Sequence, residues 1–110
     1  MAMLIARAAE AKSAADIKVL DLKRISPLAD YLVICTGESA PQIRAISLSI
    51  DEKLRAKGIK SKASKWEGKL NSNWMVLDLG SVVVHVMGPE ERARYKLEDL
   101  WEKRSIVYHL

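Results

Sequence analysis

The first residues whose types and spacing could support chemistry are Gly37-Glu38-Ser39, which follow the apolar run Tyr31–Thr36 and open a helical pattern. Backbone N–H groups at a helix N-terminus can bind a phosphate or another anion. Such a loop, together with Asp21 and Asp78, could serve a nucleotide-binding or nucleotidyltransferase enzyme. The simpler interpretation is a turn in which the Ser39 hydroxyl caps the helix, and we favour it because capping already accounts for the serine.

The sequence lacks the common signatures of cofactor and metal chemistry. Its 5 glycines form no Gly-x-Gly pair, and no P-loop lysine motif occurs. No Asp-x-Asp, Asp-x-Glu or Glu-x-Asp places two carboxylates on one face of a strand, as two-metal phosphoryl transfer commonly requires. The 2 histidines and the 1 cysteine, Cys35, exclude a histidine-rich cluster and a cysteine-based zinc site. We therefore predict no catalytic residue, no metal site and no cofactor.

Asp78 and His85 could form an acid–base pair on a predicted β-hairpin. The segments 74–79 and 82–87 have strand patterns on either side of Gly80-Ser81, and a two-residue turn would place both side chains on one face in neighbouring rungs. A carboxylate can orient an imidazole for proton transfer. No serine or cysteine nucleophile obviously joins them, so we favour a structural pairing or a polar contact surface.

Exposed aromatic side chains are the stronger candidates for function. Trp74 lies beside Met87 on the polar face of the predicted hairpin. At about 100° per residue, Tyr95 points almost opposite to the apolar side of the last helix. These residue types are favoured in protein interfaces. Acidic residues surround Tyr95 on that helix and predict a basic partner; they are Glu91, Glu98, Asp99 and Glu102. For Trp74, cover by a helix remains an open alternative.

Hydrophobic periodicity predicts the elements that position these residues. The expected helices span 3–15, 39–58 and 88–104, and the expected strands span 17–22, 31–36, 59–66, 74–79 and 82–87. In the first helix the apolar side is weak and consists of Leu4, Ala8, Ala11 and Ala15. The second begins with a Ser39–Gln42 capping box and carries an apolar stripe made of Ile43, Ile46, Ile50 and Leu54. The tail from Ile106 would close the sheet or fray.

The bulk composition is that of one globular domain over 1–110. Of 110 residues, 49% are hydrophobic and 29% charged, and the net charge is +4. No apolar run could span a bilayer and no secretory signal is evident, so we expect a cytoplasmic protein without membrane contact. A lysine cluster could lie near phosphate-rich RNA, or form a stand-alone RNA-binding module, but we favour a solvated edge. Its members are Lys57, Lys60, Lys62, Lys65 and Lys69.

Three spaced blocks of residues follow one another along the sequence. The first block is Asp21-Leu22, Ser26, Asp30-Tyr31 and Cys35-Thr36-Gly37. The second is Glu67-Gly68, Trp74, Asp78-Leu79-Gly80 and Val83-Val84-His85. The third is Glu91-Arg92, Tyr95, Leu97-Glu98 and Leu100-Trp101. Each block alone is weak, but their order and spacing are highly specific, and together they closely resemble the ribosomal silencing factor (Iojap-like) family.

The resemblance implies an α/β domain with a mixed sheet of about five strands and flanking helices, like that of nucleotidyltransferases but without the catalytic carboxylates. It implies binding to protein number fourteen of the large ribosomal subunit. There a family member blocks joining of the small subunit and represses translation under nutrient limitation, and a mitochondrial branch assists large-subunit assembly. A peripheral contact with ribosomal RNA and a homodimer of the free protein remain open.

The resemblance also indicates which residues would contact the partner. Trp74 and Tyr95 match family positions implicated in the ribosomal contact, and Asp78 and His85 match the hairpin block. The full expected partner-binding set is Trp74, Asp78, His85, Met87, Glu91, Tyr95 and Glu98. The chain departs from the family pattern at Pro41, Trp66 and Ser81, where many members have arginine, another residue and an acid, respectively. These departures concern local loops.

Overall fold

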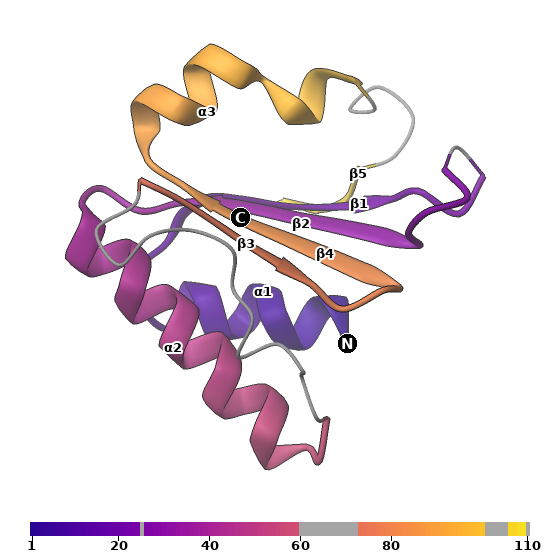
Figure 1. Cartoon of the computed structure of the whole chain (residues 1–110), viewed down its shortest axis with the longest axis horizontal. Coiled ribbons are helices and arrows are strands. Elements are labelled where there is room, and N and C mark those ends of the chain that lie inside the picture. The colour runs from indigo at the N-terminus through magenta and orange to yellow at the C-terminus, as the bar shows by residue number, and fades with distance from the viewer. Residues whose placement is uncertain (25, 60–72, 101–105, 110) are drawn as a thin grey trace.

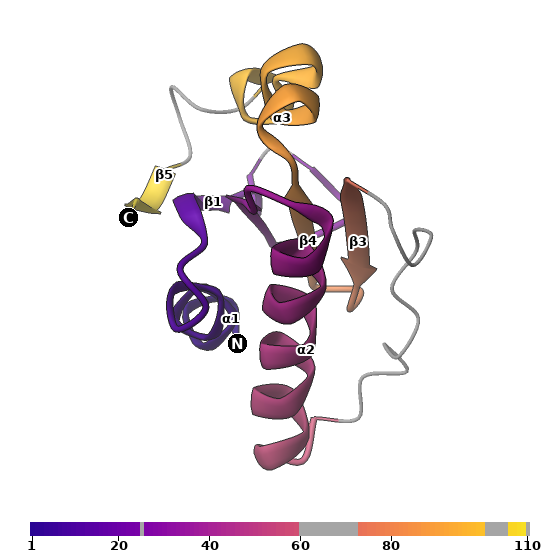
Figure 2. The same cartoon turned by 90° about the vertical axis from the view of Figure 1, so that its left-hand side faces the viewer.

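A mixed β-sheet separates two helical layers in this computed structural model, which describes residues 1–24, 26–59, 73–100 and 106–109. The helices α1 (Ala2–Glu10) and α2 (Ala40–Ala56) cover one face of the sheet. The short helix α3 (Pro89–Tyr95) and the 3-10 turn η1 (Leu97–Leu100) lie over the other face, as Figures 1 and 2 show. The predicted α/β class is therefore confirmed.

The sheet has five strands in the order β3-β4-β2-β1-β5. Their bounds are β1 Ala15–Asp21, β2 Tyr31–Thr36, β3 Trp74–Asp78, β4 Val82–Met87 and β5 Ile106–His109. The central pair β2 and β4 is parallel, and the other neighbours are antiparallel. The predicted strand 31–36 is confirmed at both ends, whereas β1 begins two residues earlier than the predicted 17–22.

The hairpin of β3 and β4 has the predicted register. Met75 pairs with Val86 and Leu77 with Val84, and the Leu79 N–H donates to the Val82 carbonyl over 2.9 Å. Gly80 has φ +82°, which a two-residue turn with glycine in its first central position requires. The turn thereby turns the aliphatic side of the hairpin toward α1 and α2.

The fifth strand differs from the expected one. The structure pairs β5 with the outer edge of β1, so the tail closes the sheet as one of the two predicted alternatives had it. The strand expected at 59–66 lies outside the described residues, apart from Ile59, which belongs to no strand. The sheet is mixed and five-stranded as predicted, but with β5 as its fifth described strand.

Helix α2 has the predicted stripe and a modified cap. Its buried apolar residues include Ile43, Ile46, Ile50 and Leu54, and Gly58 follows the helix with φ +70°. The Gln42 N–H donates to the Ser39 hydroxyl over 3.3 Å, but the Gln42 Oε1 accepts from Glu38 N, over 2.6 Å, instead of from Ser39 N. Gln42 Nε2 also donates to the carbonyls of Lys12 and Ser13, which joins this cap to the turn before β1.

Helix α1 is shorter than predicted and presents a different face. It ends at Glu10, and Ser13 follows with φ +61°, so Ala11 and Ala15 are not on the helix and are exposed. The buried residues are Ala2, Ile5, Ala6, Ala8 and Ala9. Most of them are alanines, whose small side chains let α1 approach α2 closely enough for the Ser49 hydroxyl to donate to the Ala8 carbonyl over 2.9 Å.

The single last helix predicted over 88–104 is wrong. Helix α3 ends at Tyr95, and Lys96 adopts the left-handed conformation with φ 45° and ψ 48° before η1 begins. The break lets Leu97 pack on a small apolar cluster on the sheet face. Leu97 is thereby partly buried against the sheet instead of continuing the helix. Residues 101–104 lie outside the described part of the chain.

Candidate functional site

An aromatic cluster lies where β3, β4 and α3 meet. The ring centroids of Trp74 and Tyr95 are 4.7 Å apart with planes tilted by 48°, and the Trp74 indole N–H donates to Nδ1 of His85 over 3.0 Å. Trp74 and His85 are half-buried, whereas Tyr95 is 52% exposed. The structure thus joins three residues of the predicted partner-binding set into one surface, which we call the aromatic surface.

The protonation state of His85 fits this hydrogen bond. Burial lowers the pKa of His85 from the ordinary 6.5 to about 4, so the imidazole is neutral at pH 7. A neutral imidazole has one nitrogen that accepts a hydrogen bond, and Nδ1 takes that role toward the indole. His85 therefore holds Trp74 in place beneath Tyr95.

Asp78 and His85 have separate partners. The Asp78 carboxylate is exposed and accepts the backbone N–H of Gly80 over 2.8 Å, which stabilises the hairpin turn. Nδ1 of His85 is occupied by Trp74. The structural interpretation is favoured over an acid–base pair, although each residue has a partner that the sequence did not indicate.

Two other members of the predicted set, Met87 and Glu91, are less exposed than the aromatic Tyr95. Met87 is 0% exposed and packs in the apolar cluster beneath Trp74, so its prediction as an exposed anchor is wrong in this structure. It supports the aromatic surface from below, because it pairs with Trp74 across the hairpin. Glu91 lies one turn before Tyr95 on α3 and is half-buried. The side chain of Glu98 lies outside the described residues.

A small acidic pocket adjoins the aromatic surface through Asn73 and Glu91. It has a volume of about 300 Å³ and is lined by Gly37, Glu38, Asn73, Gly88, Pro89, Glu90 and Glu91. The glycine loop after β2 thus lies beside glutamates, which repel a phosphate and attract a basic group. Because the Glu38 N–H is also taken by Gln42, the capping interpretation of this loop is favoured over an anion cradle.

The residues of the alternative nucleotide site do not come together. Gly37 follows the last residue of β2, whereas Asp21 pairs with Tyr31 at the first residue of β2. Asp78 lies at that same first end, because it pairs with Val83 of β4, next to Leu32. A strand of this length separates its ends by roughly 16 Å. Among the residues that the structure describes, no group of three or more His, Cys, Asp or Glu side chains could hold a metal ion.

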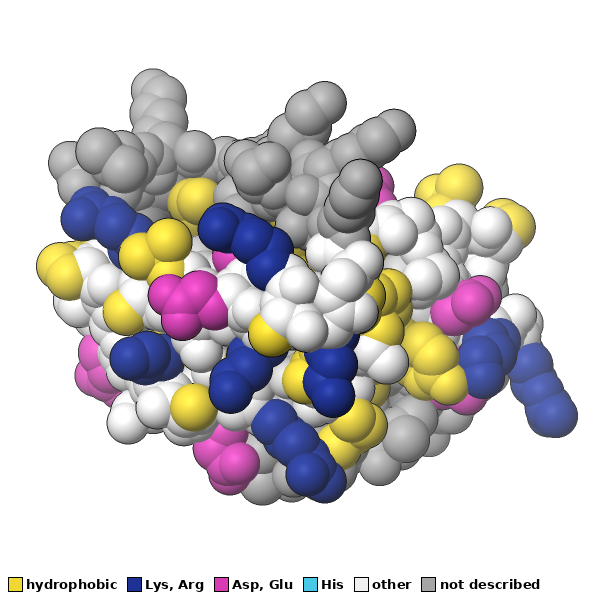
Figure 3. Space-filling model, turned by 90° about the horizontal axis from the view of Figure 1, so that it is seen from below, with side chains coloured by type: hydrophobic (Ala, Val, Ile, Leu, Met, Phe, Trp, Pro, Cys, Tyr) yellow, Lys and Arg dark blue, Asp and Glu magenta, His cyan; other side chains and the backbone are white. Residues whose placement is uncertain are grey.

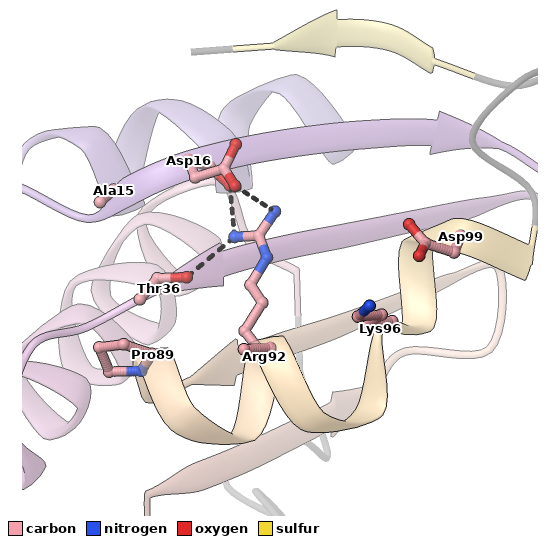
Figure 4. A pocket seen from close by; sticks show the side chains of 8 residues that line it. Ala15, Asp16, Thr36, Pro89, Arg92, Lys96 and Asp99 are labelled. Carbon is pink, nitrogen blue, oxygen red and sulfur yellow. Dashed lines mark hydrogen bonds and ion pairs between the residues drawn. The ribbon is translucent and has the colours of Figure 1, made fainter.

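A buried arginine joins α3 to the start of β1 and the end of β2, as Figure 4 shows. Arg92 Nη1 donates to the Asp16 carbonyl over 2.5 Å and to the Thr36 hydroxyl over 3.0 Å, and Nη2 lies 3.2 Å from the Asp16 carboxylate. These groups line an open pocket of about 460 Å³ between α3 and the ends of β1 and β2. The sequence predicted no role for Arg92, because its partner Asp16 lies 76 residues away. Arg94 on the same helix is exposed, and the local sequence does not distinguish the two arginines.

The opposite face of the molecule differs in character. Figure 3 shows Lys and Arg side chains interspersed with hydrophobic and acidic ones over the layer of α1 and α2. Its exposed large apolar side chains include Met1 and Leu48. Of the predicted lysine cluster, Lys57 is described and exposed, and its other members lie outside the described residues. None of the helices in the described ranges is sufficiently long and apolar to cross a bilayer.

Comparison with known proteins decides the family. The family model described as "Ribosomal silencing factor during starvation" matches residues 1–109. The chain belongs to this family. The ribosomal silencing factor RsfS of Bacillus subtilis is 44% identical over 98 residues, which cover 89% of this chain and 81% of that protein. The recognition of this family from the spaced sequence blocks is therefore confirmed.

Solved structures support the same relationship. A crystal structure of a protein from Chromobacterium violaceum is 33% identical and superposes with a TM-score of 0.83, covering 96% of this chain and 88% of that one. A crystal structure from Bacillus halodurans is 37% identical with a TM-score of 0.76, covering 90% of each chain. The fold of the ribosomal silencing factor family is thus shared over nearly the whole chain.

Proposed function

We propose that this protein represses translation by occupancy and not by catalysis. It docks on the large ribosomal subunit through ribosomal protein number fourteen, and the bound protein leaves no room for the small subunit. Repression of this kind would act in the cytoplasm when nutrients are limiting. Membership of the ribosomal silencing factor family supports the proposal, and the aromatic surface supplies the means of docking.

The observation that carries the proposal is the contact between the tilted rings of Trp74 and Tyr95. Aromatic residues are enriched among the few side chains that dominate binding energy in protein interfaces. Tyr95 is held by the Trp74 ring and is still half exposed, and His85 fixes Trp74 in turn. The pair is therefore preorganised, which reduces the entropy lost when a partner orders it.

The charge of the same region favours a basic partner. Residues 73–99 contain five acidic and three basic side chains, although the whole chain has a net charge of +4. One of the three basic side chains, Arg92, is buried against Asp16. Of these acidic residues, Glu90 and Glu91 line the pocket that adjoins the aromatic surface, whereas Asp78 lies at the other end of β3 from Trp74. Complementary charge steers association and favours one orientation of docking.

The direct test removes one aromatic ring at a time. Trp74→Ala and Tyr95→Ala should each weaken co-sedimentation with purified large subunits by at least about tenfold, as expected for loss of an interface anchor. Leu48→Ala is the matched control, because Leu48 is 53% exposed, like Tyr95, but lies on α2 across the molecule. Circular dichroism and thermal unfolding verify that each variant is folded.

A subunit-joining assay tests the second half of the proposal. Wild-type protein should reduce the formation of whole ribosomes from purified subunits, and Tyr95→Ala should reduce it less at equal concentration. Normal binding by both aromatic variants would show that the aromatic surface is not the docking site. Binding without any effect on joining would contradict steric repression. Saturable binding of a magnesium–nucleoside triphosphate in calorimetry would instead support the enzyme alternative.

A further inference from the structure

Helix α3 carries Tyr95 and Glu91 but has little apolar packing of its own. It has 7 residues, and within Pro89–Tyr95 the buried residue is Arg92. Isolated helices shorter than about 12–15 residues are marginal in water. The orientation of α3 must therefore be set by contacts with the rest of the molecule, and Arg92 supplies contacts from its buried side.

The groups that accept hydrogen bonds from Arg92 lie at an irregularity of the sheet. The register of β1 against β2 shifts between Ala15 and Lys18, and Asp16 has φ +47° within this bulge. A bulge re-aims the residues that it contains. Here the carbonyl and the carboxylate of Asp16 both contact the guanidinium, and the buried Thr36 hydroxyl at the end of β2 accepts a further hydrogen bond. We call Arg92, Asp16 and Thr36 together the polar clamp.

The polar clamp and the aromatic contact hold α3 at two sides. Arg92 reaches β1 and β2, whereas Tyr95 contacts Trp74 on β3, at the other side of the sheet. Tyr95 follows Arg92 by three residues, so the two Cα atoms are separated by about 4.5 Å along the helix axis. A change in the contacts of the Arg92 guanidinium would therefore shift Tyr95 relative to Trp74.

We propose that Arg92 is a positioning residue for docking: its pairing with Asp16 and Thr36 orients α3 so that Tyr95 is presented on Trp74. This inference rests on the proposed function. A planar guanidinium can bond several acceptors at once, which a lysine ammonium cannot do in the same fixed geometry. The clamp accordingly specifies an orientation as well as a contact.

The first experiment reads the aromatic surface without any ribosome. The Trp74 indole N–H resonance in the NMR spectrum senses both the ring of Tyr95 and the hydrogen bond to His85. Arg92→Gln should move this resonance toward its position in Tyr95→Ala, and Arg92→Lys should move it part of the way. Asp16→Asn, which keeps the backbone carbonyl that Arg92 contacts, should cause a smaller shift in the same direction, and it replaces Arg92→Gln if that variant does not fold.

The second experiment separates positioning from plain stabilisation by a double-mutant cycle in large-subunit binding. Arg92→Gln should weaken binding about tenfold in the wild-type background but less than about twofold in the Tyr95→Ala background, because residues that act through one another are not additive. Ile46→Val, a core substitution in α2, provides a control that lowers stability without touching α3. It should leave binding unchanged at temperatures where it is folded.

Each outcome bears on a distinct claim. An unshifted Trp74 resonance in Arg92→Gln overturns the positioning role, whatever the ribosome experiments show. Equal weakening of binding by Arg92→Gln in both backgrounds also overturns it, because Arg92 would then act independently of Tyr95. If wild-type protein fails to bind large subunits, the proposed function fails, while the resonance still decides whether the clamp positions Tyr95.

Discussion

The two faces of the sheet are held by different physical means. Under the sheet, α2 buries Ile43, Ile46, Ile50 and Leu54 against a continuous aliphatic layer. Over the sheet, α3 buries an arginine, and a smaller apolar cluster is completed by the partly buried Trp74 and Leu97. Hydrophobic burial scales with area and is not directional, whereas ion pairs and hydrogen bonds fix orientation. The lower layer thus provides stability, and the upper one provides the geometry of a contact surface.

The largest expected effect tests the lower layer. Ile50 is 0% exposed, and Ile50→Ala should lower the free energy of unfolding by about 2–5 kcal/mol through lost burial and a residual cavity. Denaturant titration measures this loss. Large-subunit binding by the folded fraction should be unaltered, because the aromatic surface lies on the other face. A loss of affinity in the folded variant would show that the two faces are not separable.

The second-largest effect tests the upper layer through the pH dependence of the free energy of unfolding. The pKa of His85 is about 4 in the folded protein, whereas the unfolded chain has the ordinary value of 6.5. Between these values the unfolded state binds the additional proton, so stability falls as pH decreases from about 7 to about 4, by up to about 3 kcal/mol. His85→Asn does not titrate and keeps an acceptor for the Trp74 indole, so it should lack this part of the decline. Unfolding of both proteins across that pH range gives the difference, and equal pH dependence would contradict the role of His85.

The smallest effect concerns the break after α3. Lys96 has φ 45°, a conformation that favours glycine, so Lys96→Gly should stabilise the protein by up to about 1 kcal/mol. Thermal unfolding measures the change. A decrease in stability would mean that the Lys96 side chain contributes more than its backbone conformation costs, and the upper layer would then depend on a second cation beside Arg92.

Local patterns predicted the parts of the fold that short-range physics determines. The strand 31–36, the hairpin register and the apolar stripe of α2 follow from alternation, turn chemistry and helical period within a few residues. The family blocks pointed to Trp74 and Tyr95, and the structure brings their rings together. Their part in binding remains a prediction.

Features that depend on distant partners were not predictable. The alternation of the hairpin places Met87 on the same side as Trp74, as predicted. That Met87 is buried there depends on a cluster to which Leu97 also belongs, and the hairpin sequence does not reveal that contact. The break at Lys96 likewise coincides with packing of the partly buried Leu97 on the sheet, a contact that the local sequence does not indicate. Arg92 acquires its function from Asp16 in the first strand, and nothing near Arg92 in the sequence indicates that pairing.

The parallel seam between β2 and β4 has a consequence for how the chain folds. It joins Tyr31 to Val82 and Thr36 to Met87, so each rung closes a loop of about fifty residues that contains α2 and β3. Pairings between residues distant in sequence form slowly, because their loop-closure entropy must be lost before the contact is gained. A nascent chain can therefore join β2 to β4 only after the hairpin has been synthesised. The surface that α3 completes forms later still.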